Sequence, residues 1–346
     1  MRYLVPFTVS LVLLTGCTTA DQEPGSQAPA TNVAPTTVPT PAPISTPTPT
    51  ATPTEPPHPV SLPAYFDRPY RGTSLKIGAT LTDNADYRES DATFTVNGLS
   101  LSGQLLVPQG KGPFPAVVMA HGYIDPAIYT SGRGLTREQD WLARRGYVVL
   151  HVDYRNHAWS DKDPDADLEL RLGYTEDVIG AALSLRKQKW VDGDRMAILG
   201  RSMGGGVVYN ALAARPGLFK AGIAFAPVSS LARENFERWT RPDPGRGGLV
   251  ARIIDAYGEP SDNPEFWAEA SARTFFDRIT EPVLIHHGTS DDTCPIRWSR
   301  QTHRAMKAVG VDVTLRVYDG EQHAFGPQQE PAMQRTLAFL AEHGVR

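Results

Sequence analysis

The sequence predicts an α/β fold with a mostly parallel, doubly wound sheet, preceded by an antiparallel hairpin. From residue 116 onward, short apolar runs alternate with amphipathic segments of helical length. The apolar runs are uninterrupted, as in strands that are buried on both faces. Before them, residues 93–108 alternate between polar and apolar around Asn97-Gly98, which is typical of a tight hairpin turn. Together these patterns favour helices covering both faces of one sheet.

The amino terminus, residues 1–16, is typical of a signal peptide. One arginine precedes an apolar stretch that is too short to span a bilayer. Leu14-Thr15-Gly16-Cys17 then resembles the lipobox of bacterial lipoproteins, which implies cleavage before Cys17 and lipid attached to that residue. We therefore expect an extracytoplasmic protein anchored to a bacterial membrane through Cys17. The alternative is an ordinary signal peptide with a chance cysteine.

Residues 17–63 are expected to form a disordered tether. From residue 18 to 63 there is no Lys or Arg, and Thr-Pro and Ala-Pro pairs recur. Proline removes backbone donors, and so polar a stretch cannot bury enough apolar area to offset the entropy of folding. The catalytic domain is expected to span residues 64–346. If Cys17 carries lipid, Cys294 has no disulfide partner, and we interpret it as a packing residue.

From residue 116 onward the chain alternates predicted strands and helices, with one long interruption. Segment 227–280 breaks the alternation, is rich in aromatic residues and leaves the carboxyl end of a strand, so it is a candidate cap over a ligand site. Ordinary packing of a long excursion is the alternative for it. The other predicted elements are strands at 116–120, 147–154, 196–199, 221–226, 283–287 and 313–318, and helices at 136–145, 174–189, after residue 202, at 297–309 and from about 331.

Gly200-Arg201-Ser202-Met203-Gly204 is the motif around which the chain is organised. It follows the apolar run 196–199 and leads into a helical segment. In a G-x-S-x-G turn between strand and helix, the glycines permit a sharp, strained bend that exposes the serine hydroxyl. Ser202 is therefore the candidate nucleophile.

A serine nucleophile needs a base, and the base needs an acid group that orients it. Asp291 and Asp292 follow the strand at 283–287, and His323 follows the strand at 313–318. The carboxyl ends of parallel strands lie at one edge of a sheet, so these residues are expected to meet Ser202 there. Their order along the chain, serine, aspartate, histidine, is that of a known hydrolase triad.

From about Leu99 to the end, the chain resembles an α/β-hydrolase, and most of all the catalytic domain of the prolyl oligopeptidase family and its dienelactone-hydrolase-like relatives. The resemblance implies that Asp291 is the triad acid, with Asp292 as the fallback. The oxyanion hole would use the backbone N–H groups of Met203 and Tyr123. The matching segments are 120–123, 153–155, 176–178, 200–205, 287–292 and 320–323.

The expected function is hydrolysis of an ester or short peptide through an acyl-enzyme, without a cofactor. Residues 18–90 are too few and too rich in proline to form the β-propeller of the peptidases, which favours esters. The alternatives are a propeller-less serine peptidase and a non-catalytic surface lipoprotein. A net charge of -4 and the lack of a basic run argue against nucleic-acid partners. No histidine has the spacing of metal ligands. Oligomeric state stays open.

Overall fold

The computed structural model describes residues 56–346. The expected signal peptide, Cys17 and most of the tether lie outside these residues. In the part that is described, no helix is long and apolar enough to cross a membrane.

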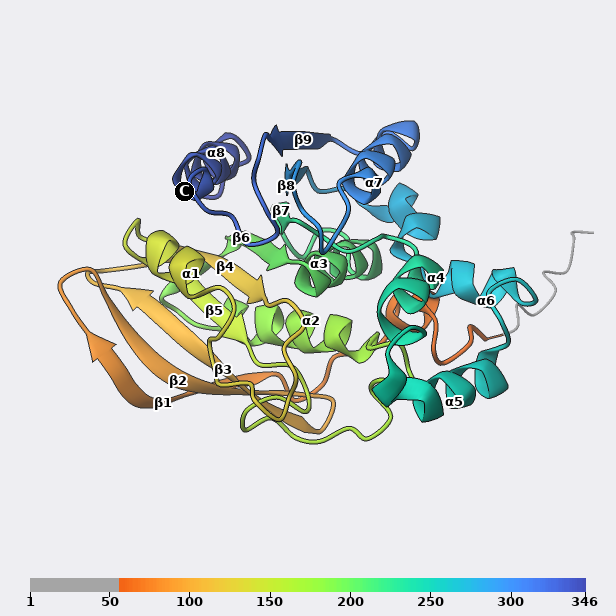
Figure 1. The fold of residues 1–346 in the computed structure, drawn as a ribbon. Coiled ribbons are helices and arrows are strands. Elements are labelled where there is room, and N and C mark those ends of the chain that lie inside the picture. The colour runs from red at the N-terminus through yellow and green to blue at the C-terminus, as the bar shows by residue number, and fades with distance from the viewer. Residues whose placement is uncertain (1–55) are drawn as a thin grey trace, which may run out of the picture. The chain divides into compact units, whose positions relative to one another are not determined.

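A nine-stranded sheet forms the centre of the domain (Figure 1). Its order is β1-β2-β3-β5-β4-β6-β7-β8-β9. In this order, the three neighbouring pairs from β1 to β5 are antiparallel. All the pairs that follow, from β5 to β9, are parallel. This confirms the predicted fold. The strands are β1 (Ser74–Asp83), β2 (Tyr87–Val96), β3 (Leu99–Pro108), β4 (Phe114–Ala120), β5 (Val148–Val152), β6 (Val191–Arg201), β7 (Ala221–Phe225), β8 (Val283–Gly288) and β9 (Val313–Tyr318).

The leading hairpin joins β2 to β3 through Asn97 and Gly98, whose φ angles of 47° and 93° are those of a tight hairpin turn. Strand β2 begins at Tyr87, further from the turn than the sequence pattern indicated, and β3 ends at Pro108, as expected. Strand β1, which the sequence did not predict, pairs with β2 at the edge of the sheet. Nearly every residue of β1 is exposed, so it has no buried face to impose an apolar alternation.

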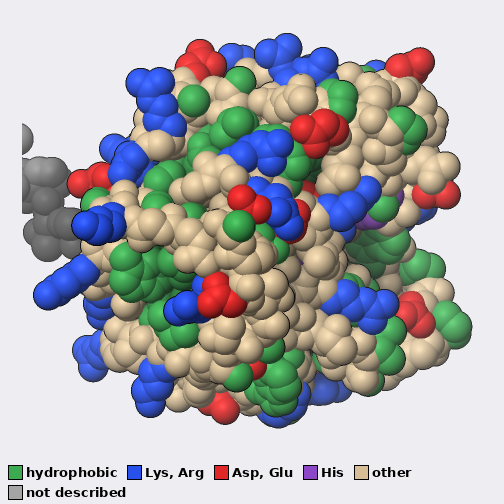
Figure 2. Space-filling model, turned by 90° about the vertical axis from the view of Figure 1, so that its left-hand side faces the viewer, with side chains coloured by type: hydrophobic (Ala, Val, Ile, Leu, Met, Phe, Trp, Pro, Cys, Tyr) green, Lys and Arg blue, Asp and Glu red, His purple; other side chains and the backbone are tan. Residues whose placement is uncertain are grey.

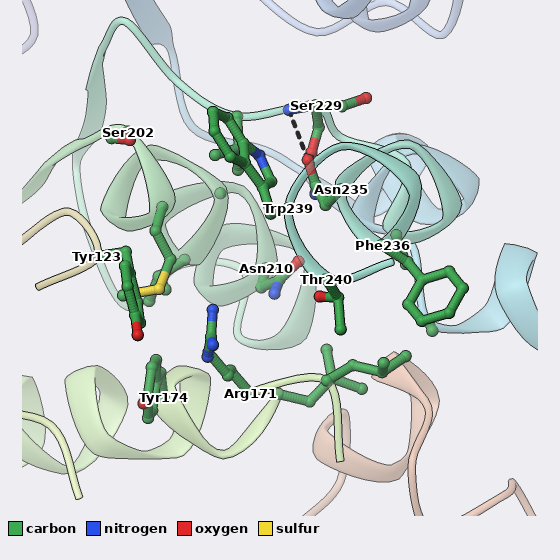
Figure 3. A pocket seen from close by; sticks show the side chains of 18 of the residues that line it. Tyr123, Arg171, Tyr174, Ser202, Asn210, Ser229, Asn235, Phe236, Trp239 and Thr240 are labelled. Carbon is green, nitrogen blue, oxygen red and sulfur yellow. Dashed lines mark hydrogen bonds between the residues drawn. The ribbon is translucent and has the colours of Figure 1, made fainter. Parts of the chain in front are cut away.

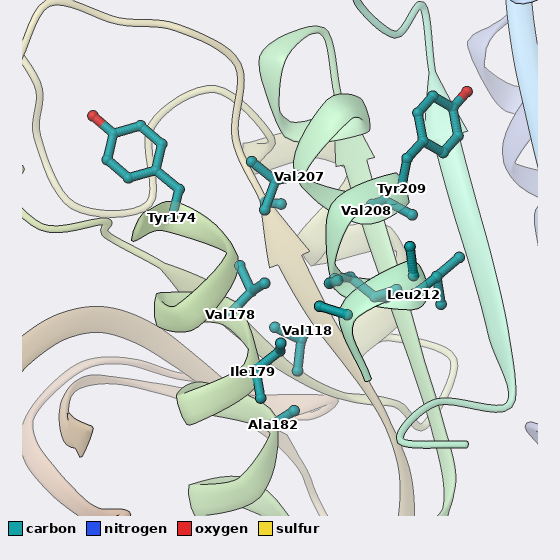
Figure 4. Close-up of a cluster of buried hydrophobic side chains, with 14 of the residues drawn as sticks. Val118, Tyr174, Val178, Ile179, Ala182, Val207, Val208, Tyr209 and Leu212 are labelled. Carbon is teal, nitrogen blue, oxygen red and sulfur yellow. The ribbon is translucent and has the colours of Figure 1, made fainter. Parts of the chain in front are cut away.

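Helices cover both faces of the sheet. On one face, α2 and α3 pack on β4 through Val118, Val178 and Leu212 (Figure 4). On the other face, α1 and α8 pack on the alternate strand residues, including Val117. Two cores separated by one sheet explain the uninterrupted apolar strands. The main helices are α1 (Thr136–Ala143), α2 (Gly173–Arg186), α3 (Met203–Ala214), α7 (Arg297–Ala308) and α8 (Gln329–Glu342).

The folded domain begins before residue 64, where the sequence placed its start. Val60 and Leu62 are buried, and a short 3-10 helix, Leu62–Tyr65, contacts α3. These residues, which the sequence analysis placed in the tether, therefore pack against the domain. Because the surrounding sequence is rich in proline, its composition did not indicate that Val60 and Leu62 pack in the domain core.

Segment 227–280 folds into short helices, among them α4 (Ala232–Asn235), α5 (Gly247–Tyr257) and α6 (Pro264–Glu269). Its aromatic residues divide into two groups. Phe266, Trp267 and Phe276 are buried and form part of the main core. Trp239 instead lines a cavity that also contains Ser202. The segment thus both packs on the domain and forms part of the wall of this cavity.

Candidate active site

Ser202 occupies a strained turn between β6 and α3. Its φ of 59° and ψ of -122° lie outside the regions that non-glycine residues normally occupy. The flanking glycines make this bend possible. A side chain at Gly200 would overlap the carbonyl of Gly204, and a side chain at Gly204 would overlap the carbonyl of Ala120 in β4. The motif therefore needs glycine at both positions for close backbone packing.

The backbone around Ser202 is held by the neighbouring strand. Its N–H donates to the carbonyl of Phe225 in β7 at 3.0 Å, and its carbonyl accepts from Val228 N at 3.1 Å. The hydroxyl Oγ lies 3.9 Å from the sulfur of Cys294. Among the described residues it has no hydrogen bond to His323. The turn is thus fixed, while the side chain retains rotational freedom about one bond.

The structure brings together His323 and Asp291, from the loops after β9 and β8. His323 Nδ1 lies 2.9 Å from Asp291 Oδ2. The other carboxylate oxygen accepts from the backbone N–H groups of Thr293 at 3.0 Å and Cys294 at 2.8 Å. Asp292, the fallback acid, is exposed and accepts instead from the Thr293 hydroxyl. Asp291 is therefore the carboxylate placed to orient the imidazole.

His287, which the sequence analysis did not single out, also contacts the acid. This buried side chain at the end of β8 has Nε2 3.1 Å from Asp291 Oδ2 and 2.8 Å from the carbonyl of Cys294. Both of these atoms are acceptors, so Nε2 carries a proton, and Nδ1 lies 2.6 Å from the Ser299 hydroxyl. The carboxylate of Asp291 thus has a histidine on each side.

These contacts determine the charge of the site. Burial alone would raise the pKa of Asp291, but hydrogen bonds from His287 and His323 outweigh it and hold this pKa below its usual range. Asp291 therefore stays ionised at neutral pH. Burial, together with the charge of Asp291, raises the pKa of the Cys294 thiol to about 12. Cys294 is consequently a neutral packing residue beside the serine and no nucleophile.

The turn after β4 lies against Ser202. A side chain at Gly122 would come within 3.1 Å of Ser202 Cβ, so only a glycine fits without displacement. Within residues 56–346, neither Met203 N–H nor Tyr123 N–H has a hydrogen-bond partner. Both expected oxyanion donors are therefore next to the serine in sequence or in space and free to donate to a ligand oxygen.

A cavity of about 480 Å³ contains both Ser202 and His323 (Figure 3). Its volume lies in the range of small-molecule sites. The wall comes from the loop before α2, from α3 and from segment 227–280. Residues lining it include Tyr123, Arg171, Tyr174, Asn210, Ser229, Asn235, Phe236, Trp239, Thr240 and Arg246. The sequence analysis expected Ser202, Met203, Tyr123 and His323 at the site and segment 227–280 as a cap over it, but it did not expect Arg171, Tyr174 or Asn210 there.

Among residues 56–346, no group of three or more His, Cys, Asp or Glu side chains is arranged to hold a metal ion. On the face shown in Figure 2, Lys and Arg side chains are scattered among acidic, polar and hydrophobic ones.

Comparison with known proteins identifies the family. Residues 134–344 match the model of the prolyl oligopeptidase family. The chain is 31% identical over 240 residues to dipeptidyl aminopeptidase BIII of Pseudoxanthomonas mexicana, covering 68% of this chain and 34% of that protein. It is 33% identical over 200 residues to dipeptidyl peptidase 4 of Felis catus, covering 56% of this chain and 25% of that protein. The chain thus spans about a third or less of these relatives.

Solved structures share the fold. Acetyl xylan esterase 1 from Thermoanaerobacterium sp. JW/SL YS485 superposes with a TM-score of 0.63 at 19% identity, over 82% of this chain and 93% of that one. Dipeptidyl peptidase 4 from Porphyromonas gingivalis superposes with a TM-score of 0.57 at 20% identity, over 79% of this chain and 36% of that one. The predicted α/β-hydrolase fold is confirmed, and the chain belongs to the prolyl oligopeptidase family.

Proposed function

We propose that this domain hydrolyses an ester or a short peptide through an acyl-enzyme formed on Ser202. One observation carries the proposal. A serine on a strained strand-to-helix turn shares a cavity with a histidine whose Nδ1 is bound to a buried aspartate. Because Nδ1 faces Asp291, Nε2 is the ring atom left to exchange protons with the serine and the substrate.

The proposed reaction has two halves. As Ser202 Oγ attacks the carbonyl carbon, its proton passes to His323 Nε2, and the oxyanion accepts from the N–H groups of Met203 and Tyr123. The tetrahedral species expels the alcohol or amine, which takes the proton from His323. Water then loses a proton to His323 and attacks the acyl-enzyme. The second tetrahedral species breaks its bond to Ser202 Oγ, which takes the proton from His323, and the acid is released. Asp291, ionised at neutral pH, stabilises the imidazolium in both halves. The missing bond between Ser202 and His323 agrees with the rule that catalytic hydrogen bonds commonly tighten when substrate binds.

Two substrate classes fit this site. A cavity of about 480 Å³ accommodates a short acyl or aminoacyl group, whichever bond joins it to the leaving group. Membership of the prolyl oligopeptidase family and the dipeptidyl peptidase relatives favour a peptide. The non-catalytic alternative is not supported, because the serine, the histidine and the aspartate are all present and two of them are hydrogen-bonded.

A side-by-side panel of substrates tests the function. We expect turnover of short acyl 4-nitrophenyl esters, acetylated sugars or aminoacyl 4-nitroanilides, and a loss of at least about a thousandfold in kcat for Ser202→Ala. The ratio of kcat/KM for esters to that for amides identifies the substrate class. Turnover that survives Ser202→Ala unchanged would show that the activity belongs to another site or a contaminant.

We further propose that Cys17 carries the lipid that anchors this domain to a bacterial membrane, outside the cytoplasm. The proposal rests on the apolar stretch of residues 1–16 and on the lipobox-like Leu14-Thr15-Gly16-Cys17. Expression of the full chain in a bacterium and incorporation of labelled fatty acid provide the test. Label that is retained in Cys17→Ser would refute lipidation at this residue.

A further inference from the structure

Two arginines lie at the wall of the cavity that contains Ser202. Arg171 precedes α2, and Arg246 lies in segment 227–280. Both guanidinium groups lie near the ring of Tyr123, with their central carbons 4.7 and 5.2 Å from its centroid. Such stacking holds a guanidinium in a defined plane and favours directional binding over a diffuse charge.

The carboxylates of the cavity are already paired. Asp167 accepts from Arg171 Nε at 2.6 Å, and Asp243 lies 3.2 Å from Arg246 Nε. In the described part of the chain, these are the only acidic residues that line the cavity. A substrate ammonium would therefore meet no unpaired carboxylate on this wall.

The two arginines differ in their free donors. Arg246 uses Nη2 to donate to the Tyr123 hydroxyl at 2.7 Å. Within residues 56–346, Arg171 has no hydrogen bond from either terminal nitrogen, since its one bond is through Nε. Its guanidinium points into the space between Tyr123 and Asn210 (Figure 3). Its side chain is only 19% exposed, so much of the hydration that would weaken ligand binding is already removed.

The backbone at Arg171 is strained. Leu170 and Arg171 have φ angles of 52° and 58°, in the left-handed region that disfavours residues with a Cβ. Hydrogen bonds hold this bend: Arg171 N donates to Ala166 O at 2.8 Å, and Tyr174 N donates to Arg171 O at 3.1 Å. Two consecutive residues in this conformation, separated from α2 by Leu172 alone, set the point from which the arginine enters the cavity.

We propose that Arg171 forms an anion subsite through which this enzyme selects substrates carrying a carboxylate near the scissile acyl group. Nε is occupied by Asp167, and the two terminal nitrogens remain to donate to the two oxygens of a planar carboxylate. Asn210, on α3 beside this space, supplies a further polar side chain. The inference rests on the proposed acyl transfer at Ser202 and adds a substrate class to it.

The test compares matched esters that differ by one carboxylate. On the acyl side the pair is mono-4-nitrophenyl adipate and 4-nitrophenyl hexanoate. On the alcohol side it is 3-carboxyphenyl acetate and 3-methylphenyl acetate. In the wild type we expect kcat/KM to favour the carboxylate by about tenfold or more in one of the pairs. Arg171→Gln should abolish this preference, and Arg171→Lys, which keeps the charge but loses the planar fork, should retain part of it.

A control separates local from general charge effects. Arg186→Gln removes an exposed arginine that does not line the cavity and should keep the wild-type ratio. A wild type that prefers the neutral ester in both pairs, or an Arg171→Gln variant that lowers both members of a pair equally, would refute the subsite. If Arg171→Gln does not fold, the wild-type ratios and Arg171→Lys still decide. Turnover of the neutral esters, which does not involve the subsite, reports on the proposed function separately.

Discussion

Asp291 accepts hydrogen bonds from His287, His323 and two backbone N–H groups. Each carboxylate oxygen thus accepts two hydrogen bonds, and together these bonds hold the carboxylate in one orientation. The imidazole of His323 is thereby kept in one tautomer and one plane, which is the function of an acid in a serine hydrolase. His287 acts on the reaction only through Asp291 and is a positioning residue.

We expect substitution of the two adjacent aspartates, Asp291 and Asp292, to have very different effects on kcat. Asp291→Asn should lower kcat by about three orders of magnitude or more, because an amide would favour the wrong tautomer of His323 and leave its developing charge unbalanced. Asp292→Asn should change kcat by less than about fivefold, because its side chain contacts only Thr293. Steady-state kinetics on one ester would decide between them. A larger loss of kcat in Asp292→Asn than in Asp291→Asn would show that Asp292 is the triad acid.

The sequence could predict that Ser202, Asp291 and His323 lie at one edge of the sheet, because each of them follows an apolar strand. It could not predict His287 as a partner of Asp291. His287 ends β8, and only the return of the 288–294 loop onto the strand brings the two side chains within 3.1 Å. The 3.9 Å approach of Cys294 to Ser202 depends on the same loop. Contacts that a loop conformation creates leave no periodic signal in the chain.

Among the elements, the β6-turn-α3 unit positions the nucleophile and is the most predictable. Its apolar strand, its glycines and its helix all indicate the same structure. Segment 227–280 is the opposite case. Its helices α4 and α6 have four and six residues, too short to form without tertiary packing, so composition alone could not place them. The position of the Arg171 side chain in the cavity likewise depends on the positive φ angles of Leu170 and Arg171, which no sequence pattern predicts.

For the whole molecule, one sheet between two helical layers buries His151 and His286 on the face that α1 and α8 cover. Burial, aided by Arg201, lowers the pKa of His151 to about 3. Burial likewise lowers the pKa of His286 to about 3, with Arg335 and Arg316 as further causes. Both imidazoles therefore stay neutral in the folded domain between about pH 6.5 and pH 3, a range in which histidines of the unfolded chain take up protons.

This predicts a loss of stability in mild acid. Above pH 6.5 neither state takes up these protons, and below it the unfolded chain does so first. The free energy of unfolding should therefore fall as the pH decreases from 6.5 towards 3, by at most about 1.4 kcal/mol per pH unit for each histidine. Urea unfolding at several pH values would measure the slope. His151→Gln should flatten it, and a slope equal to that of the wild type would exclude His151 as a cause.

The central claim is that Ser202 is a nucleophile activated by His323 and Asp291. Reaction of the purified domain with a fluorophosphonate probe, followed by mass spectrometry of its peptides, tests it most directly. We expect one adduct, on Ser202, with labelling abolished by Ser202→Ala and slowed by at least about a hundredfold in Asp291→Asn. An adduct on any other residue, or labelling of Ser202→Ala at the wild-type rate, would contradict the claim.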